Sequence, residues 1–361
     1  MRSRTEISSF QLIFILIHGQ IGVGVITLPY DVFVKARTDA WISILLTGII
    51  IQIFIFIYGC LLRRFPNYTL FDIAIHLLGK VVGRIFIVLF ILSYLGVATL
   101  IMARFSYFLK TWMMPMTPKW ILLLILSFTV IFIVIENIQV IGRFTFLMSI
   151  VFIGFFVVSI YALKYINITH ILPIGSSGIT SITKGIEPAL FSFQGFEFLL
   201  ILHPFVKATP RNIIKATSIA NIFITLFYTM LMLITLLYFS ENELKIVPEP
   251  VLYLMKAFSS RMIERPDLLF TSMWIVLAVT TLIITVYSGT LGIMTVMHSS
   301  NLRNYTILFT FLSFLLSLSL YDKHIINVAS KIHNYTSTPV LFFMPVVLLL
   351  IAIIFRKRKE G

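Results

Sequence analysis

Two interruptions lie in matching places in the two halves of this chain. The first is Gly22-Val23-Gly24, within the apolar stretch of residues 10–30, and the second is Gln194-Gly195-Phe196-Glu197, within residues 186–206. Each stretch has about the 20 residues that a helix needs to cross a bilayer. A helix broken at this depth exposes backbone N–H and C=O groups, and each unsatisfied group is costly in hydrocarbon. Such breaks are therefore expected only where protein or a water-filled cavity covers them.

Composition assigns the chain to a class of protein. Of its 361 residues, 59% are hydrophobic and only 12% are charged, whereas a soluble domain averages about 25% charged residues. We therefore expect an all-α polytopic membrane protein in which residues 1–361 form a single integral membrane domain. The net charge of +14 comes from basic residues scattered over the predicted loops, which is typical of membrane topology and not of nucleic-acid binding. The single cysteine, Cys60, excludes an internal disulfide.

The hydropathy pattern predicts ten transmembrane helices. The spans lie at about residues 8–34, 40–62, 83–109, 118–136, 144–164, 184–206, 212–239, 268–298, 303–320 and 338–356. An even number places both termini on the same side of the membrane. The basic tail Arg356-Lys357-Arg358-Lys359 and the acidic residues concentrated in the opposite loops favour the cytoplasm for that side. The tail would lie against anionic membrane lipid, and residues 240–267 would form the longest loop, outside.

Each half of this pattern begins with an interrupted helix. With five spans in each half, about residues 8–164 and about residues 184–356 would form an inverted repeat, and paired interruptions in such repeats point to a transporter-type binding site. The alternative is that the glycines only allow close helix packing. The candidate contact residues at the two breaks are Gly22, Val23, Gly24, Phe193, Gln194, Gly195, Phe196 and Glu197.

Glu197 is the carboxyl group that the sequence places deepest in the membrane. A charged side chain at this depth is costly and usually faces a cavity. Glu197 would contact a cationic group of a ligand, carry a proton, or accept hydrogen bonds from backbone N–H groups freed by the break. The sequence leaves these three roles open.

Polar residues of spans three and eight complete the predicted site. Span eight carries a stripe at intervals of three and four residues, which places its members on one helical face and would line either a polar cavity or a tight helix contact. The stripe consists of Thr281, Thr285, Ser288, Gly292 and Thr295. We select Ser288, its neighbour Tyr287, and Thr99 of span three as candidate contacts. Arg104 of span three is interpreted as a snorkelling side chain, and His18 of span one as a packing residue.

Signatures of enzymes are missing from the sequence. It contains no phosphate-binding glycine loop with its lysine, no His-Glu-x-x-His motif and no serine nucleophile elbow. We therefore expect no enzymatic activity, no cofactor and no metal site.

The two interruptions also carry a resemblance to a known family. Gln20-Ile-Gly22-Val-Gly24-Val-Ile-Thr-Leu-Pro29 resembles the first-span signature of the amino acid–polyamine–organocation superfamily, and Phe193-Gln194-Gly195-Phe196-Glu197 resembles its sixth-span signature. Within that superfamily the chain is most similar, over essentially its whole length, to the spore germination receptor B subunits, the endospore germination permeases. This assignment within the superfamily rests on length, span number and the short loops.

The resemblance implies a fold, a location and partners. The fold would be leucine-transporter-like, with broken helices one and six and a small-molecule site near the bilayer midplane between spans one, three, six and eight. The ligand would be a germinant, commonly an amino acid and sometimes a sugar or nucleoside. The protein would lie in the inner membrane of a bacterial spore, in complex with a larger membrane receptor subunit and a lipoprotein subunit. Some superfamily members carry a lysine in the middle of span five that assists transport, and this chain has none between Phe144 and Leu163.

Two functions follow from these observations. The first is a germinant-sensing receptor subunit that binds a small molecule, and the alternative is a proton- or cation-coupled amino acid permease. In both, freed amides of a broken helix and the positive end of a half-helix dipole would bind an α-carboxylate. Freed carbonyls would bind an ammonium group or a metal cation. The sequence does not separate the two functions, because both need the same pocket.

Overall fold

A computed structural model describes residues 6–22, 24–257 and 266–357, and within these ranges the chain is helical, with no β-strand. Val23, a predicted contact at the first break, lies outside the described residues. Residues 258–265, which are part of the predicted outer loop, also lie outside them. The α-helices are α1 (Ser9–Gln20), α2 (Gly24–Ala36), α3 (Ala40–Arg64), α4 (Leu70–Trp112), α5 (Lys119–Val134), α6 (Ile138–Met148), α7 (Val151–Ala162), α8 (Gly178–Ser192), α9 (Phe198–Leu202), α10 (Pro210–Tyr238), α11 (Glu241–Leu244), α12 (Pro250–Ala257), α13 (Pro266–Val296), α14 (Leu302–Ser319), α15 (Lys323–Thr338) and α16 (Met344–Ile354).

The length and the composition of these helices are those of an integral membrane protein. Seven helical stretches in the described residues are long and apolar enough to cross a bilayer, and the shorter helices α1 and α5 are also apolar. Large apolar side chains cover the outside of the bundle, including Phe128 and Phe132 of α5, which are 65% and 73% exposed. Such a surface is stable in contact with lipid, because lipid tails do not penalise exposed apolar groups as water does.

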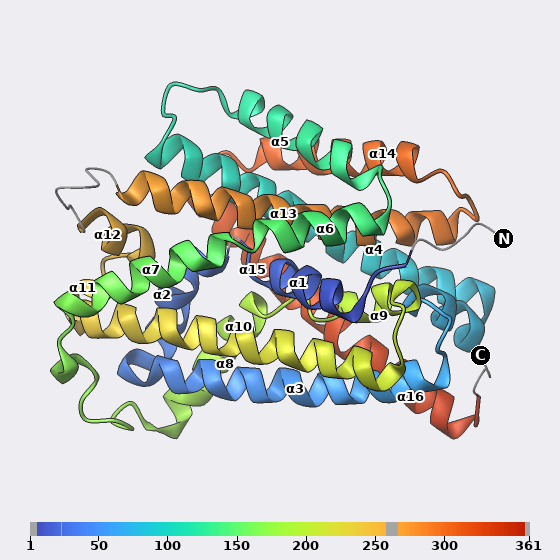
Figure 1. Ribbon diagram of the computed structural model, residues 1–361, viewed down its shortest axis with the longest axis horizontal. Coiled ribbons are helices and arrows are strands. Elements are labelled where there is room, and N and C mark those ends of the chain that lie inside the picture. Colours follow the sequence, from blue (N-terminus) through green and yellow to red (C-terminus); the bar gives the residue numbers. More distant parts are fainter. Residues whose placement is uncertain (1–5, 23, 258–265, 358–361) are drawn as a thin grey trace.

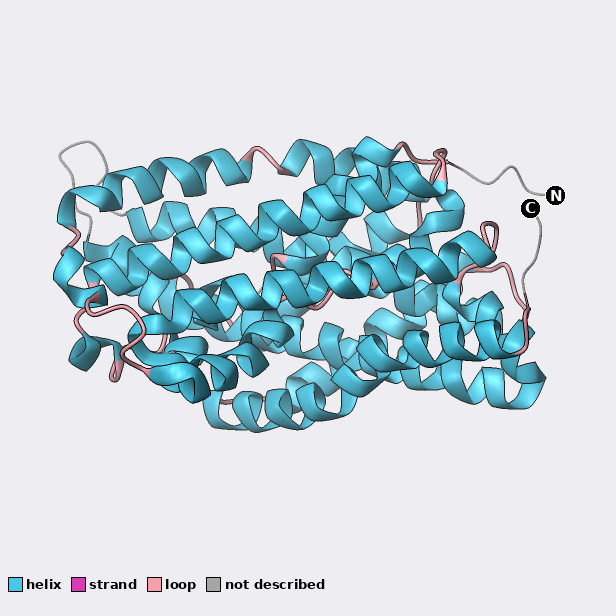
Figure 2. Ribbon diagram, turned by 90° about the horizontal axis from the view of Figure 1, so that it is seen from below, coloured by secondary structure: helices cyan, strands magenta, loops and turns pink. Residues whose placement is uncertain are grey.

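Long helices surround a centre built from short ones. Figure 1 shows α3, α4, α10 and α13 running along the length of the bundle, with α1, α2, α8 and α9 between them. Helix α2 packs along α8, while α1 packs against α10, α6 and α13. The bundle is helical throughout its depth, and the first and last described residues lie at the same end (Figure 2).

Local signals explain where the long helices begin. Thr69 and Asp72 form a capping box at the start of α4, in which each side chain accepts a hydrogen bond from the backbone N–H of the other. These bonds satisfy N–H groups that have no partner within the helix. Gly79, with φ of 80°, separates residues 70–78 from the long membrane segment that follows. The side chain of Thr209 caps α10 by accepting a hydrogen bond from the backbone N–H of Asn212, with Pro210 in the first helical position.

The last membrane helix begins earlier than its predicted span at residues 338–356. Helix α15 starts at Lys323 and continues through a π-helical turn at Pro339–Phe343 into α16. Hydropathy missed α15 because this helix is strongly amphipathic. The cavity described below explains why a membrane helix carries polar residues such as Ser330 and Asn334.

Candidate functional site

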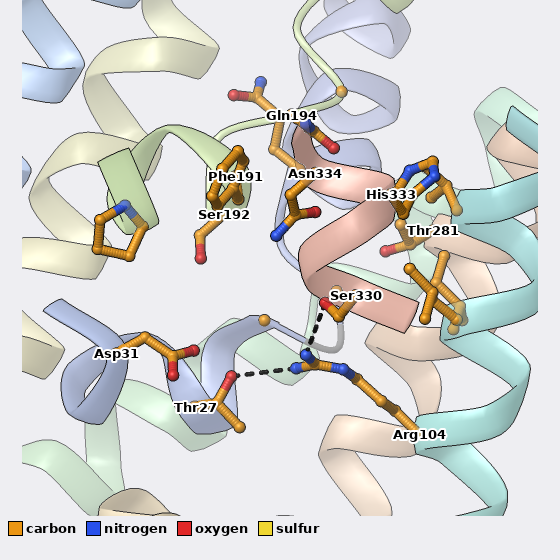
Figure 3. A pocket seen from close by; sticks show the side chains of 18 of the residues that line it. Thr27, Asp31, Arg104, Phe191, Ser192, Gln194, Thr281, Ser330, His333 and Asn334 are labelled. Atoms are coloured by element: carbon orange, nitrogen blue, oxygen red, sulfur yellow. Dashed lines mark hydrogen bonds between the residues drawn. The ribbon is translucent and has the colours of Figure 1, made fainter. Parts of the chain in front are cut away.

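A cavity of about 730 Å³ lies where the two interrupted helices meet. Its walls come from both breaks and from α2, α4, α8, α13 and α15. Figure 3 shows polar side chains of these elements pointing toward one another across the space. Concave sites of this size that combine apolar walls with a few polar groups are typical of small-molecule binding.

At the first break, side chains from neighbouring helices satisfy the freed carbonyl groups. Helix α1 ends at Gln20 and α2 begins at Gly24. The hydroxyl of Tyr228 on α10 donates to the carbonyl oxygen of Gln20 at 2.9 Å, and the hydroxyl of Thr281 on α13 donates to that of His18 at 2.6 Å. The break therefore carries internal partners for carbonyls that hydrocarbon would leave unsatisfied.

The second break depends on a glycine and an acid. Gly195 has a φ of 117°, and a Cβ atom there would lie 2.5 Å from the carbonyl oxygen of Gly19. The carboxyl group of Glu197, which is only 1% exposed, accepts a hydrogen bond from the N–H of Gly195 at 2.7 Å. Only glycine therefore fits this close approach of the two broken helices.

Tyr228 links the two breaks. Its hydroxyl oxygen lies 2.9 Å from the carbonyl oxygen of Gln20 and 3.2 Å from that of Ser192, the last residue of α8. The hydroxyl has one proton to share between these two acceptors. The side chain is fully buried, so this shared bond is shielded from water.

The structure brings part of the predicted site to the cavity. Gly22, Gly24, Gln194, Gly195 and Glu197 all border it, as do Thr281 and Thr285 of the predicted stripe on α13. Val23 lies outside the described residues.

The remaining predicted contacts lie behind the cavity wall. Phe193 packs against Tyr228, and Phe196 stacks on Tyr58 with ring centroids 5.4 Å apart. The hydroxyl of Thr99 donates to its own helix, to the carbonyl of Leu95. Tyr287 and Ser288 are buried on α13 and are not among the lining residues.

Sequence reasoning did not predict the part of the cavity wall that contains Arg104. The guanidinium of Arg104 on α4 donates to the hydroxyl of Thr27 on α2 at 3.2 Å and to that of Ser330 on α15 at 3.0 Å (Figure 3). Asp31, one turn beyond Thr27, also borders the cavity. Two signals were available: an arginine inside an apolar span, and the helical spacing of Asn327, Ser330 and Asn334.

Near the first break, the side chain of His18 links α1 to polar groups of two neighbouring segments. Its ring nitrogens are 2.8 Å from the hydroxyl of Thr280 on α13 and 3.0 Å from that of Ser149, between α6 and α7. The side chain is fully buried, and both ring nitrogens have partners. Within the described ranges, no group of three or more His, Cys, Asp or Glu side chains is arranged to hold a metal ion.

Comparison with known proteins assigns the chain to a family. Residues 6–326 match the family described as spore germination protein. The chain belongs to this family. It is 28% identical to the spore germination protein GerQB of Bacillus cereus, with 94% of this chain and 95% of that protein covered. It is 27% identical to the spore germination protein YndE of Bacillus subtilis (strain 168), with 80% of each covered.

Two solved structures share the fold. The chain aligns with a Na⁺-coupled sialic acid symporter with a TM-score of 0.69 and 12% sequence identity, over 94% of this chain and 80% of the symporter. It aligns with Mhp1, a nucleobase-cation-symport-1 family transporter, with a TM-score of 0.67 and 12% identity, over 99% of this chain and 81% of Mhp1. The family member described here therefore has the fold of these transporters.

Proposed function

We propose that this family member is the germinant-sensing membrane subunit of a spore germination receptor. In this proposal one domain of ten transmembrane helices, formed by residues 1–361, folds as a leucine-transporter-like inverted repeat of about residues 8–164 and about residues 184–356. The protein lies in the inner spore membrane with both termini in the cytoplasm. A larger membrane subunit and a lipoprotein subunit complete the receptor.

The observation that carries this proposal is the cavity at the meeting point of the two helix breaks. A small molecule, which we propose to be an amino acid, would occupy it and contact Gly22, Gly24 and Gln194 directly. Phe193 and Phe196 would hold the second break from behind. Ligand binding would change how the half-helices pack against their neighbours, and that change would be passed to the partner subunits.

The alternative function is a cation-coupled amino acid permease, and the likeness in fold to symporters favours it. Transport requires the cavity to open in turn to both sides of the membrane, whereas sensing requires only binding and a change in conformation. The two functions therefore differ in one measurable property, which is net movement of the ligand across the bilayer.

Germination of spores and uptake by vesicles test the two functions. Spores that lack this chain should lose their response to at least one amino acid among a panel of germinants, and the wild-type gene should restore it. Proteoliposomes that contain only this chain should bind that amino acid, in radiolabelled form, without accumulating it. Unchanged germination with every germinant of the panel would reject the receptor function. Accumulation driven by a proton or sodium gradient would establish the permease.

A further inference from the structure

One freed backbone N–H of the second break, that of Gly195, is already occupied. The N–H of Gly195 already donates to the carboxyl group of Glu197. An incoming carboxylate would have to displace a buried acid that is attached two residues away on the same chain. This competition weakens the break as an anion site, so a ligand with a negative charge needs another partner.

Arg104 is a cation of the cavity wall with spare donors. A guanidinium group has five N–H donors, and the recorded bonds of Arg104 go to two neutral hydroxyl groups, those of Thr27 and Ser330. In the part of the chain that the structure describes, Arg104 forms no ion pair with a carboxylate. Its side chain is half-buried, whereas Lys35 and Lys331, which also border the cavity, are exposed. A planar guanidinium in this setting is suited to bind a carboxylate through two hydrogen bonds.

Asp31 supplies an opposite charge close by. Among the acids near Arg104, Asp31 has the largest electrostatic effect on the guanidinium, ahead of Glu249, and it borders the same cavity. The hydroxyl of Thr27, one turn before Asp31 on α2, accepts a hydrogen bond from Arg104 (Figure 3). Of the other two acids of the cavity, Glu197 accepts a hydrogen bond from Gly195, and Glu187 interacts electrostatically with Tyr335.

We infer that Arg104 and Asp31 form the charged end of the ligand site and select a zwitterionic α-amino acid. The carboxylate of the ligand binds Arg104, and its ammonium group faces Asp31. In an α-amino acid the two charges are separated by a single carbon atom, and in the protein the complementary charges of Arg104 on α4 and Asp31 on α2 border the same cavity. The ligand's side chain then points toward the apolar wall formed by Val97, Leu100 and Ile101 of α4.

This arrangement also predicts which ligands are rejected. A neutral sugar or nucleoside offers no charge to Arg104 or Asp31, so it would displace water from these groups without forming a charge-assisted hydrogen bond in return. The inference rests on the proposed function, because it assigns the charged contacts of that same ligand site. It narrows the ligand class from any small germinant to a free amino acid.

Binding to the purified, full-length chain in detergent tests the inference. Thermal stabilisation is first measured with each common L-amino acid, with D-glucose and with inosine. Calorimetry then gives the Kd of the most stabilising amino acid, of its primary amide and of its des-amino acid. On the wild-type protein both analogues should bind about 10- to 100-fold more weakly than the amino acid, because each lacks one charge-assisted contact.

Variants assign each charge of the ligand to its partner. Arg104→Gln should weaken binding of the amino acid by the same factor and should bind the amino acid and its amide about equally. Arg104→Lys should recover part of the lost affinity. Asp31→Asn should bind amino acid and des-amino acid about equally. Lys110→Gln, which removes an exposed cation from the end of the same helix and lies outside the cavity lining, should bind like the wild type.

The outcomes separate the inference from the proposed function. Equal binding of the amino acid and its amide to the wild-type protein, or an undiminished affinity in Arg104→Gln, overturns the inference and leaves the receptor function standing. Binding of D-glucose or inosine with no binding of any amino acid does the same. Binding of none of these probes overturns both. The comparison of analogues uses the wild-type protein alone, so it decides the question even if a variant fails to fold.

Discussion

The carboxyl group of Glu197 accepts a hydrogen bond from the backbone N–H of Gly195, two residues before it, at 2.7 Å. Both groups are buried at the second helix break. The sequence alone left three roles open for this acid, and the bond shows the structural one: Glu197 provides a partner for an N–H group that the break removes from the helical pattern. An N–H group without a partner would be costly at this depth.

Two substitutions of Glu197 should therefore distinguish the effect of its side-chain volume from the effect of its hydrogen bond. The side chain of Glu197→Gln keeps an oxygen that accepts from Gly195, so the variant should retain its fold and ligand response. Glu197→Leu removes the acceptor and leaves a buried N–H group unsatisfied, which should cost about 1–3 kcal/mol and abolish the response. Thermal unfolding in detergent and germination of spores measure the two effects. A Leu variant with wild-type stability and response would contradict this role.

Gly195 should tolerate no side chain. Its φ of 117° and the 2.5 Å approach of an added Cβ to the carbonyl of Gly19 predict that Gly195→Ala destabilises the protein by about 3 kcal/mol or more. Gly178→Ala is the matched control, because Gly178 has a φ of 77° but nothing within 4 Å of an added Cβ. The control should lose only about 1–2 kcal/mol. Similar losses of thermal stability in the two variants would mean that the helices do not approach closely at Gly195.

The hydroxyl of Tyr228 should be needed to hold the two breaks together. Tyr228→Phe removes the donor shared by the carbonyls of Gln20 and Ser192 and should cost about 1–3 kcal/mol. Tyr321→Phe, at a side chain that is 73% exposed, should change stability by less than about 0.5 kcal/mol. Thermal unfolding and ligand affinity of both variants provide the comparison. An unaffected Tyr228→Phe protein would show that other groups satisfy these carbonyls.

The sequence located the breaks because their signals are local. Glycines in an apolar span and a lone buried acid are each unusual at membrane depth, and they identify residues 22–24 and 194–197 without any knowledge of packing. The class of the protein follows from composition for the same reason. Hydropathy predicts a loop where α15 lies, because hydropathy averages over all faces of a helix and the polar face of α15 borders the cavity.

The contacts between helices could not be predicted in this way. Nothing near Tyr228 in the sequence indicates that its hydroxyl reaches two breaks more than 30 residues away. The local sequence favours a snorkelling role for Arg104, because its hydrogen-bond acceptors, Thr27 and Ser330, lie on other helices. For Ser288, the spacing of the stripe on α13 indicates a shared helical face, but which face meets the cavity depends on how the helix is rotated against its neighbours. The rotation of α4 likewise decides whether Thr99 meets the cavity.

Membrane topology is the remaining prediction, and the inverted repeat depends on it. Helix α10 has 29 residues and is about 43 Å long at 1.5 Å per residue, which is long enough for its two ends to lie on opposite sides of a bilayer. We expect Arg211, at its start, in the cytoplasm, and Ile246, in the exposed loop after it, outside. Single cysteines at these positions in a Cys60→Ala background, in intact cells of a bacterial host, are probed with a membrane-impermeant thiol reagent. Labelling at position 246 but not at 211 is expected, with both labelled after lysis as the control. The reverse pattern would place the basic tail outside, and equal labelling would remove α10 as a membrane span and with it the pairing of the two breaks.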